Sequence, residues 1–239
     1  MYRSCKRYIG TPPKEEFYFL FIFIMSPISI QNSVDTDSKI ALYTRVFGEA
    51  PWNEGYICTT TGNLYSLSSE QLTCICCETP NRTKLFYTPE ELQSTFDLLE
   101  KKKGYQEQIA MITENNAPVG FMWWWRSSLI EINEDKLKIT PEQLENLKAN
   151  IMAKNESFNL SDFYYFAEIG IEAGNRGSDI AGNLYRAQIE AVIQNGNGSI
   201  LVRTTKKTDL PYKWFLKIWY IPVFDYNDQQ DRVILIKQY

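Results

Sequence analysis

The chain has 239 residues, of which 44% are hydrophobic and 23% are charged, and its formal net charge at pH 7 is −4. This is the composition of an ordinary globular protein, and it provides no global attraction to nucleic acid or to acidic membrane surfaces. Because the sequence contains no histidine, it excludes a Ser-His-Asp triad, a Cys-His dyad and every metal site with histidine ligands.

The first 24 residues do not fit a targeting segment. Residues 17–25 are nine consecutive apolar residues, whereas a membrane-spanning helix needs ~20. Glu15 and Glu16 directly precede this run and no A-x-A cleavage site follows it, which argues against a signal peptide. We therefore expect 1–24 to be a disordered or non-native extension before a single domain over 25–239. A short segment that associates with a membrane surface is the alternative.

The pattern of residues predicts alternating strands and helices in the first half of the chain. Ile28 and Ile30 alternate with polar residues and predict a strand. The polar residues 35–38 offer helix caps, and apolar positions at helical spacing in 39–47 predict a helix. Residues 56–87 show no clear period. Thr88 and Glu91 have the spacing of a capping box and predict a helix that runs to about residue 103.

The cysteines lie mostly in this stretch without a period. The chain has five, and Cys74, Cys76 and Cys77 are crowded together, which is a poor disulfide framework and favours a reducing, cytoplasmic compartment. Cys74 and Cys77 have the spacing of half a zinc site, and Cys58 lies upstream. The pattern therefore predicts either a partial zinc site, with Cys58, Cys74 and Cys77 as ligands, or reduced cysteines in a loop between the first two helices.

The second half of the chain reads as hairpins around a strand-turn-helix-strand unit. The segments QIAMITEN and VGFMWWWR predict a hairpin through 115–118, and 127–160 is interpreted as an insertion with a helix over 140–154. After this come an expected strand, helix, strand, helix and closing hairpin, over 162–171, 179–195, 199–205, 209–218 and 220–239. This order predicts an α+β fold on a mixed, mostly antiparallel sheet flanked by helices.

The turn between the strand 162–171 and the helix 179–195 has the sequence Asn-Arg-Gly-Ser-Asp. Successive backbone N–H groups and the positive end of a helix dipole form a site for phosphate groups. Gly177 would let the backbone approach an anion closely. Most turns of this kind only connect elements, so the turn alone is a weak signal of a phosphate site.

The segment IGIEAGNRGSDIAGNLYRAQIEAVI resembles the cofactor motif of the GNAT superfamily of acyl-CoA N-acyltransferases. In that pattern, a strand ending in Val-x-Pro precedes Arg/Gln-x-x-Gly-x-Gly/Ala at the start of a helix. Arg176 and Ala181 stand at the first and last of these positions, and Asp179 replaces the middle glycine. IALYTRVFGEAPWNE, PVGFMWWWR and ILVRTTKKTDLPYKWFLKIWYIPVF resemble further family segments in the family order, so the resemblance covers the chain from about residue 27.

The resemblance implies a GNAT fold with insertions after the first helix and before the cofactor-binding strand. It also implies acetyl-CoA as co-substrate and direct attack on its thioester by a primary amine of an unidentified acceptor. The residues expected to bind the cofactor are Ile169, Gly170, Ile171, Arg176, Gly177, Ser178, Asp179, Ile180, Ala181 and Gly182. Phe215 stands where many relatives carry the tyrosine that protonates the departing thiolate.

Two residues are candidates for catalysis. Glu168 is the candidate base, with a solvated strand residue as the alternative, and Tyr212 is the candidate acid, with a half-buried anchor as the alternative. Trp123 and Trp125 share a strand face that could line the acceptor pocket, and Trp124 is expected in the core. The variable segments 52–87 and 126–160 are expected to shape that pocket.

The sequence leaves two functions open. The first is an active N-acetyltransferase with acyl-CoA and an amine-bearing acceptor as partners, without nucleic acid, as a monomer or a homodimer. The second is a catalytically impaired acyl-CoA-binding or protein-interaction module on the same fold, which the departures at Asp179 and Phe215 favour.

Overall fold

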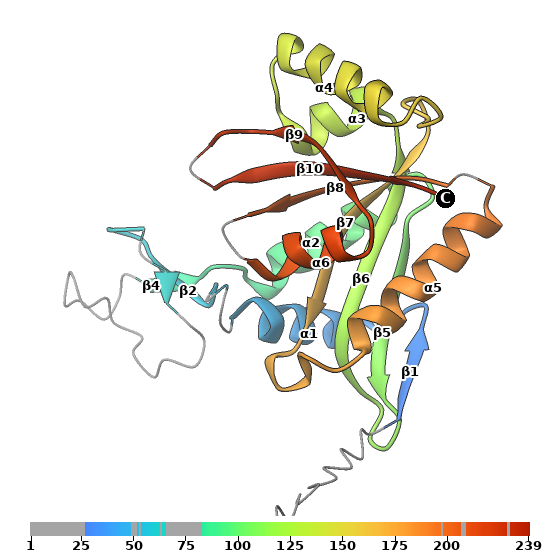
Figure 1. Cartoon of the computed structure of the whole chain (residues 1–239). Coiled ribbons are helices and arrows are strands. Elements are labelled where there is room, and N and C mark those ends of the chain that lie inside the picture. The colour runs from blue at the N-terminus through green and yellow to red at the C-terminus, as the bar shows by residue number, and fades with distance from the viewer. Residues whose placement is uncertain are drawn as a thin grey trace, which may run out of the picture.

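The computed structural model describes residues 27–48, 52, 54–62, 64–65, 83–196, 198–206, 209–228 and 230–239. Within these ranges the chain forms a seven-stranded sheet, in the order β1-β5-β6-β7-β8-β10-β9, and a three-stranded sheet in the order β3-β2-β4. Helices cover both faces of the large sheet, and the small sheet projects to one side of it (Figure 1).

Neighbouring strands are antiparallel except for β7 and β8, which are parallel. The strands of the large sheet are β1 (Ile28–Gln31), β5 (Gln106–Ile112), β6 (Ala117–Ser127), β7 (Phe163–Ile171), β8 (Ser199–Thr205), β9 (Ile221–Asp225) and β10 (Arg232–Gln238). Those of the small sheet are β2 (Tyr56–Cys58), β3 (Leu64–Tyr65) and β4 (Thr83–Leu85). The predicted α+β fold on a mostly antiparallel sheet is confirmed.

The helix α2 begins where its capping signal predicts. The helices are α1 (Thr36–Gly48), α2 (Pro89–Glu100), α3 (Leu129–Ile132), α4 (Pro141–Lys154), α5 (Ile180–Gln194) and α6 (Asp209–Lys217), with a π-helical turn at Asn133–Leu137 and a 3₁₀ turn at Ala173–Asn175. At α2, the Thr88 hydroxyl accepts a hydrogen bond from the Glu91 N–H at 3.2 Å, and the Glu91 carboxylate accepts one from the Thr88 N–H at 3.0 Å. This reciprocal capping box confirms the predicted start of the helix.

The sequence pattern missed two local features. The stretch 56–87, which has no clear period, contributes the three strands of the small sheet, because strands of two or three residues are too short to display an alternation. The helix predicted to run to residue 103 ends at Glu100. A turn follows, in which Gly104 has a φ of +62°.

The core forms two layers, one on each face of the large sheet. One layer packs α1, α2 and α4 against the face that carries Trp123 and Trp125, and the other packs α5 and α6 against the face that carries Trp124. The predicted split of the three tryptophans between the faces is confirmed. Trp123 and Trp124 are each 1% exposed and Trp125 is 2% exposed. Trp123 and Trp125 therefore belong to the core as fully as Trp124 does.

Gly170 in β7 occupies a position without room for a side chain. A Cβ at this position would lie 2.5 Å from the Phe121 ring and 2.7 Å from Val46 Cγ1. Gly170→Ala is therefore expected to reduce the free energy of unfolding by about 1–3 kcal/mol, because an added methyl in a packed core forces its neighbours apart. Equilibrium denaturant unfolding measures this loss. Gly174→Ala is the matched control, since a Cβ there meets no atom within 4 Å, and equal losses in both variants would contradict the prediction.

No helix in the described ranges is long and apolar enough to cross a membrane.

Candidate active site

The parallel strands β7 and β8 separate in the middle of the large sheet. They pair over Tyr164–Phe166 with residues 200–202 and no further. A cavity of about 250 Å³ opens where they part, lined by both strands, by α1 and α6, and by the start of β10. The edge of β7 that follows Phe166 therefore faces this cavity and has no partner in β8.

A β-bulge in β7 brings Glu168 into the cavity. Trp123 in β6 pairs with Glu168, whereas the next residue, Trp124, pairs with Phe166, so that Ala167 is an extra residue in β7. Ala167 packs in the core layer that contains α1, and Ile169 packs in the layer on the other face of the sheet. Glu168 lines the cavity between them and interacts with Tyr43 of α1.

The surroundings of Glu168 favour its protonated form. Burial raises the pKa of the Glu168 carboxyl to about 7, and the negative charge of Glu54 adds to this rise. Lys136, Tyr43 and Arg203 lower the same pKa and limit the shift. A carboxyl group whose pKa lies near 7 can accept and release a proton at neutral pH, which is the property required of a general base.

Two tyrosines and a second glutamate stand around Glu168, and the sequence analysis did not single them out. Burial, followed by the charge of Glu168, raises the pKa of the Tyr43 hydroxyl. Burial, followed by the charges of Glu54 and Glu168, raises the pKa of Tyr87 to about 12. Burial also raises the pKa of Glu54. Both hydroxyls therefore keep their protons at neutral pH and can donate hydrogen bonds.

The structure does not bring Tyr212 into the cavity of Glu168. Tyr212 lines a separate cavity of about 580 Å³ with residues of α4, β9 and β10, and the Lys206 ammonium lies 6.0 Å from the centroid of its ring. From the same helix, Phe215 lines the Glu168 cavity. Phe215 packs edge-on against Phe166 with the ring centroids 5.5 Å apart.

The turn that leads into α5 presents a run of unused backbone donors. The N–H groups of 177–182 form no hydrogen bond with a described residue. Gly177 has a φ of +82°, and a Cβ there would meet no atom within 4 Å. The conformation of the turn, and not lack of space, is therefore what requires glycine. The segment contains most of the residues expected to bind the cofactor.

Side chains of the turn hold it in place. The Arg176 guanidinium donates a hydrogen bond to the Ile171 carbonyl at 2.9 Å, and the Ser178 hydroxyl donates one to the Asn175 carbonyl at 2.5 Å. Glu172 forms an ion pair with Arg45 of α1 at 2.7 Å. These contacts fix the turn against the end of β7 and against α1, so that its N–H groups are preorganised.

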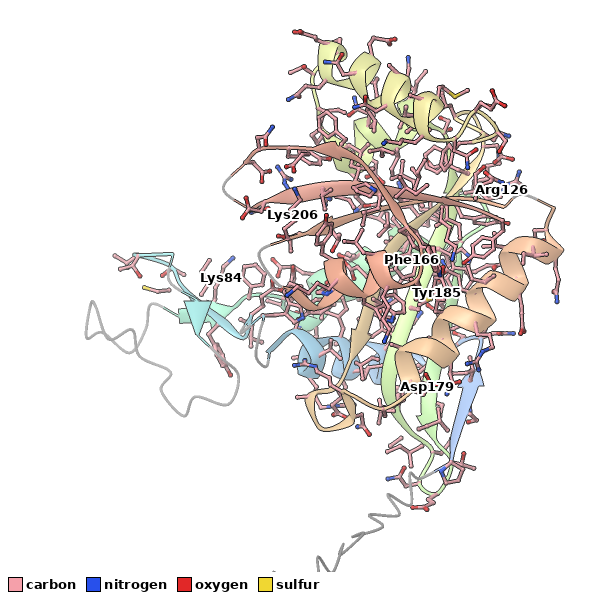
Figure 2. The ribbon with its side chains drawn as sticks, viewed as in Figure 1. Lys84, Arg126, Phe166, Asp179, Tyr185 and Lys206 are labelled. Atoms are coloured by element: carbon pink, nitrogen blue, oxygen red, sulfur yellow. The ribbon has the colours of Figure 1, made fainter. Side chains whose placement is uncertain are left out.

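Asp179 stands at the N-terminal end of α5 (Figure 2) without acting as a helix cap, since its carboxylate accepts no capping hydrogen bond. The carboxylate instead lies 3.7 Å from the Arg186 guanidinium. It also lies in the space that a Cβ at position 182 would enter, so a larger residue at Gly182 would require the exposed Asp179 side chain to rotate away.

The zinc hypothesis remains a prediction. Cys58 is buried in β2, and the Thr61 N–H points to its sulfur at 3.4 Å. Cys74 and Cys77 lie outside the residues that the structure describes. Among the described residues, no group of three or more Cys, Asp or Glu side chains is arranged to hold a metal ion.

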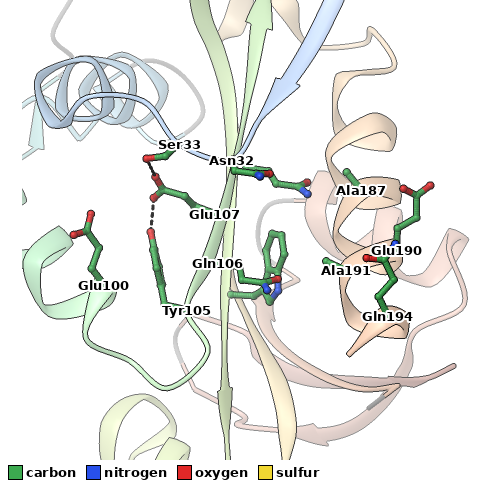
Figure 3. Close-up of a pocket in the computed structure, with 12 residues that line it drawn as sticks. Asn32, Ser33, Glu100, Tyr105, Gln106, Glu107, Ala187, Glu190, Ala191 and Gln194 are labelled. Atoms are coloured by element: carbon green, nitrogen blue, oxygen red, sulfur yellow. Dashed lines mark hydrogen bonds between the residues drawn. The ribbon is translucent and has the colours of Figure 1, made fainter. Parts of the chain in front are cut away.

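A larger cavity, of about 770 Å³, lies at the edge of β5 and shares no residue with the Glu168 cavity. It contains a buried polar cluster, in which Glu107 accepts hydrogen bonds from Ser33 at 2.7 Å and from Tyr105 at 2.6 Å (Figure 3). The Lys39 ammonium lies 2.8 Å from the same carboxylate. Because every charge in this cluster has a partner, we assign it to the support of the fold.

The strand order, the separating pair β7–β8 and the turn into α5 together form the fold of the GNAT N-acetyltransferases. The mosquito arylalkylamine N-acetyltransferase like 5b is similar with a TM-score of 0.55 and 11% identity, over 89% of this chain and 100% of that chain. A candidate GNAT-family acetyltransferase from Desulfovibrio desulfuricans is similar with a TM-score of 0.50 and 13% identity, over 89% of this chain and 99% of that chain.

An uncharacterised protein from Bacillus halodurans is similar with a TM-score of 0.50 and 10% identity, over 88% of this chain and 83% of that chain. No protein-family model matches the sequence, and no match was found among curated protein sequences. At these identities the structural likeness establishes the fold, as the sequence motifs implied. The activity is argued from the site.

Proposed function

We propose that the protein is an N-acyltransferase that moves an acetyl group from acetyl-CoA to a primary amine. The observation that carries this proposal is the cavity between the separated strands β7 and β8, where a bulge presents a carboxyl group with a pKa near 7. The same strand continues into a turn with unused N–H donors. A site for a phosphate-bearing co-substrate and a candidate base are thus joined by one strand.

The N–H groups of 177–182 are the proposed donors to the pyrophosphate of CoA, supported by the positive end of the α5 dipole. The edge of β7 beyond Phe166, which includes the expected residues Ile169, Gly170 and Ile171, has no partner in β8. Backbone N–H groups on this edge are available to the amides of the pantetheine arm and to the thioester carbonyl. The acetyl group of acetyl-CoA would then lie in the cavity, beside Glu168.

In the proposed reaction, the neutral amine nitrogen attacks the thioester carbon. The C–N bond forms, the C–S bond breaks and the electron pair of that bond leaves on the thiolate of CoA. Glu168 accepts the proton that the amine nitrogen loses, directly or through a water molecule. A thiol with a pKa of ~8.5 is a fair leaving group, so the thiolate can take its proton from solvent without an acid in the cavity. Tyr212 would assist only from the adjacent cavity.

A catalytically impaired acyl-CoA-binding module is the second candidate. Phe215 lines the cavity where a proton donor would serve, and Asp179 adds a negative charge at the turn. Thiol release from acetyl-CoA, measured with a panel of primary amines, separates the two functions. An enzyme releases CoA in an amine-dependent manner, whereas a binding module shows affinity for acetyl-CoA without turnover.

Asp179→Asn is expected to tighten the binding of CoA by about fivefold, because unit charges 4 Å apart in water interact by ~1 kcal/mol. The Asp179 side chain is 72% exposed, so the gain should shrink at high ionic strength. Isothermal titration of CoA at low and high salt measures both effects. Asp179→Gly restores the family glycine and should act in the same direction, and weaker binding by both variants would contradict the prediction.

A further inference from the structure

Positive charges surround Glu168 on the α1 face of the sheet. Arg203 of β8 and Arg232 of β10 line the cavity with Glu168. Lys136, from the π-helical turn after α3, and Arg203 act electrostatically on the Glu168 carboxyl. These cations come from segments that are not required for the phosphate-binding turn, so they are candidates for contact with the acceptor.

Lys136 and Arg203 have no carboxylate partner in the described ranges, whereas Arg232 pairs with Asp228. Arg203 donates a hydrogen bond to the main-chain carbonyl of Lys136, which holds the two residues together. The Lys136 ammonium lies 5.9 Å from the centroid of the Trp125 ring. Both side chains are half-buried. The Glu168 carboxyl on which they act has a pKa of about 7 and carries only part of a negative charge at neutral pH, so the two cations are incompletely compensated.

A simple alkylamine fits this arrangement poorly. Such an acceptor enters as an ammonium ion and would meet the positive charges of Arg203 and Arg232, which line the cavity with Glu168. An acceptor that also carries a carboxylate brings its own compensating charge. The guanidinium group of Arg203 binds the Lys136 carbonyl and the Tyr226 hydroxyl. It has five N–H donors in all, and its planar geometry suits a carboxylate.

We propose that the acceptor is a free amino acid, with its carboxylate held by Arg203 and Lys136 and its amine directed to Glu168. The proposal rests on the proposed acetyl transfer and specifies the acceptor at the same site. The cavity of about 250 Å³ has room for a molecule of this size and not for a folded protein segment. Phe47 and Trp52 at the same cavity can pack against the carbon skeleton.

The test compares amino acids with amines that differ only by the carboxylate. Acetyl-CoA and the full chain are assayed for thiol release with L-phenylalanine against phenethylamine, and with L-lysine against 1,5-diaminopentane. We expect kcat/KM to be at least tenfold higher for the carboxylate-bearing member of a pair. In Arg203→Met the ratio of the two kcat/KM values should fall to about one, because the KM for the amino acid rises. Arg203→Lys should retain part of the preference for the amino acid.

Lys136→Met provides a second, independent variant, and thermal unfolding checks that each variant is folded. A preference for the carboxylate-free amines, or an unchanged ratio in both Met variants, would overturn the assignment of the acceptor and leave acetyl transfer intact. Weaker binding of CoA to Arg203→Met without acceptor would also overturn it, because the cation would then serve the co-substrate. Absence of thiol release with every amine would reject the proposed acetyl transfer itself, and the acceptor with it.

Discussion

Glu168→Gln is expected to lower kcat for acetyl transfer by about 100- to 10,000-fold, the range attributed to a positioned general base. Glutamine has nearly the same shape as glutamate, so it should preserve the bulge and the contact with Tyr43 while removing the group that accepts the proton. Steady-state thiol release at saturating acetyl-CoA measures the loss.

Tyr212→Phe is the comparison for this prediction. Because Tyr212 lines the neighbouring cavity, the loss of its hydroxyl should reduce kcat by less than about tenfold, which is below the range expected of a positioned acid or base. A large loss in Tyr212→Phe together with near-normal activity in Glu168→Gln would reverse our assignment of the two residues.

The pH dependence of the rate should carry the signature of Glu168. Burial raises the pKa of its carboxyl to about 7, and only the deprotonated carboxylate can act as the base. The rate should therefore rise with pH up to about 7, by about tenfold per pH unit well below that value, because the active fraction then follows the hydroxide concentration. In Glu168→Gln the inflection near pH 7 should disappear, and the remaining rise should follow the deprotonation of the acceptor amine. An identical limb in the variant would assign the titration to another group.

Gly177→Val is expected to weaken the binding of CoA by at least about 100-fold. The φ of +82° at this position lies in a region that a β-branched residue rarely adopts, so valine should turn the adjacent N–H groups away from the phosphates. A ligand at ~100 times its dissociation constant stabilises a protein by ~2.7 kcal/mol. CoA should therefore raise the melting temperature of the parent protein and leave that of the variant almost unchanged.

Gly174→Ala is the control within the same loop. Its Cβ would meet no atom within 4 Å, and it lies in the 3₁₀ turn at Ala173–Asn175, before the unused N–H groups. This variant should bind CoA as the parent does. Retention of binding by Gly177→Val would show that the turn into α5 connects two elements and does not hold the phosphates.

Local chemistry in the sequence was enough to predict most of the elements. The capping box of Thr88 and Glu91 spans four residues, and the hairpin of β5 and β6 joins segments that are adjacent in the chain. The strand, turn and helix around Gly177 are likewise contiguous, so a short motif indicated both the fold and the candidate phosphate site. Signals of this kind depend on residues that are close together in the chain, so they can be recognised in the sequence.

The surroundings of Glu168 were set by contacts between distant segments. Tyr43 comes from α1, Tyr87 from the segment before α2, Lys136 from the turn after α3 and Arg203 from β8. In the sequence, Tyr43 reads as one apolar position of a helix, and nothing local distinguishes Lys136 from the other surface lysines. The bulge at Ala167, which turns Glu168 into the cavity, likewise depends on the register with β6.

Tertiary packing also separated residues that the sequence had grouped. Tyr212 and Phe215 are one helical turn apart, yet they line different cavities, which depends on the segments that pack around α6. The pKa of Glu168 depends on how much water the fold removes and which charges it leaves nearby. Burial and charge at this site are properties of the packed molecule. The sequence could therefore predict Glu168 as a candidate base, and only the structure could indicate its pKa.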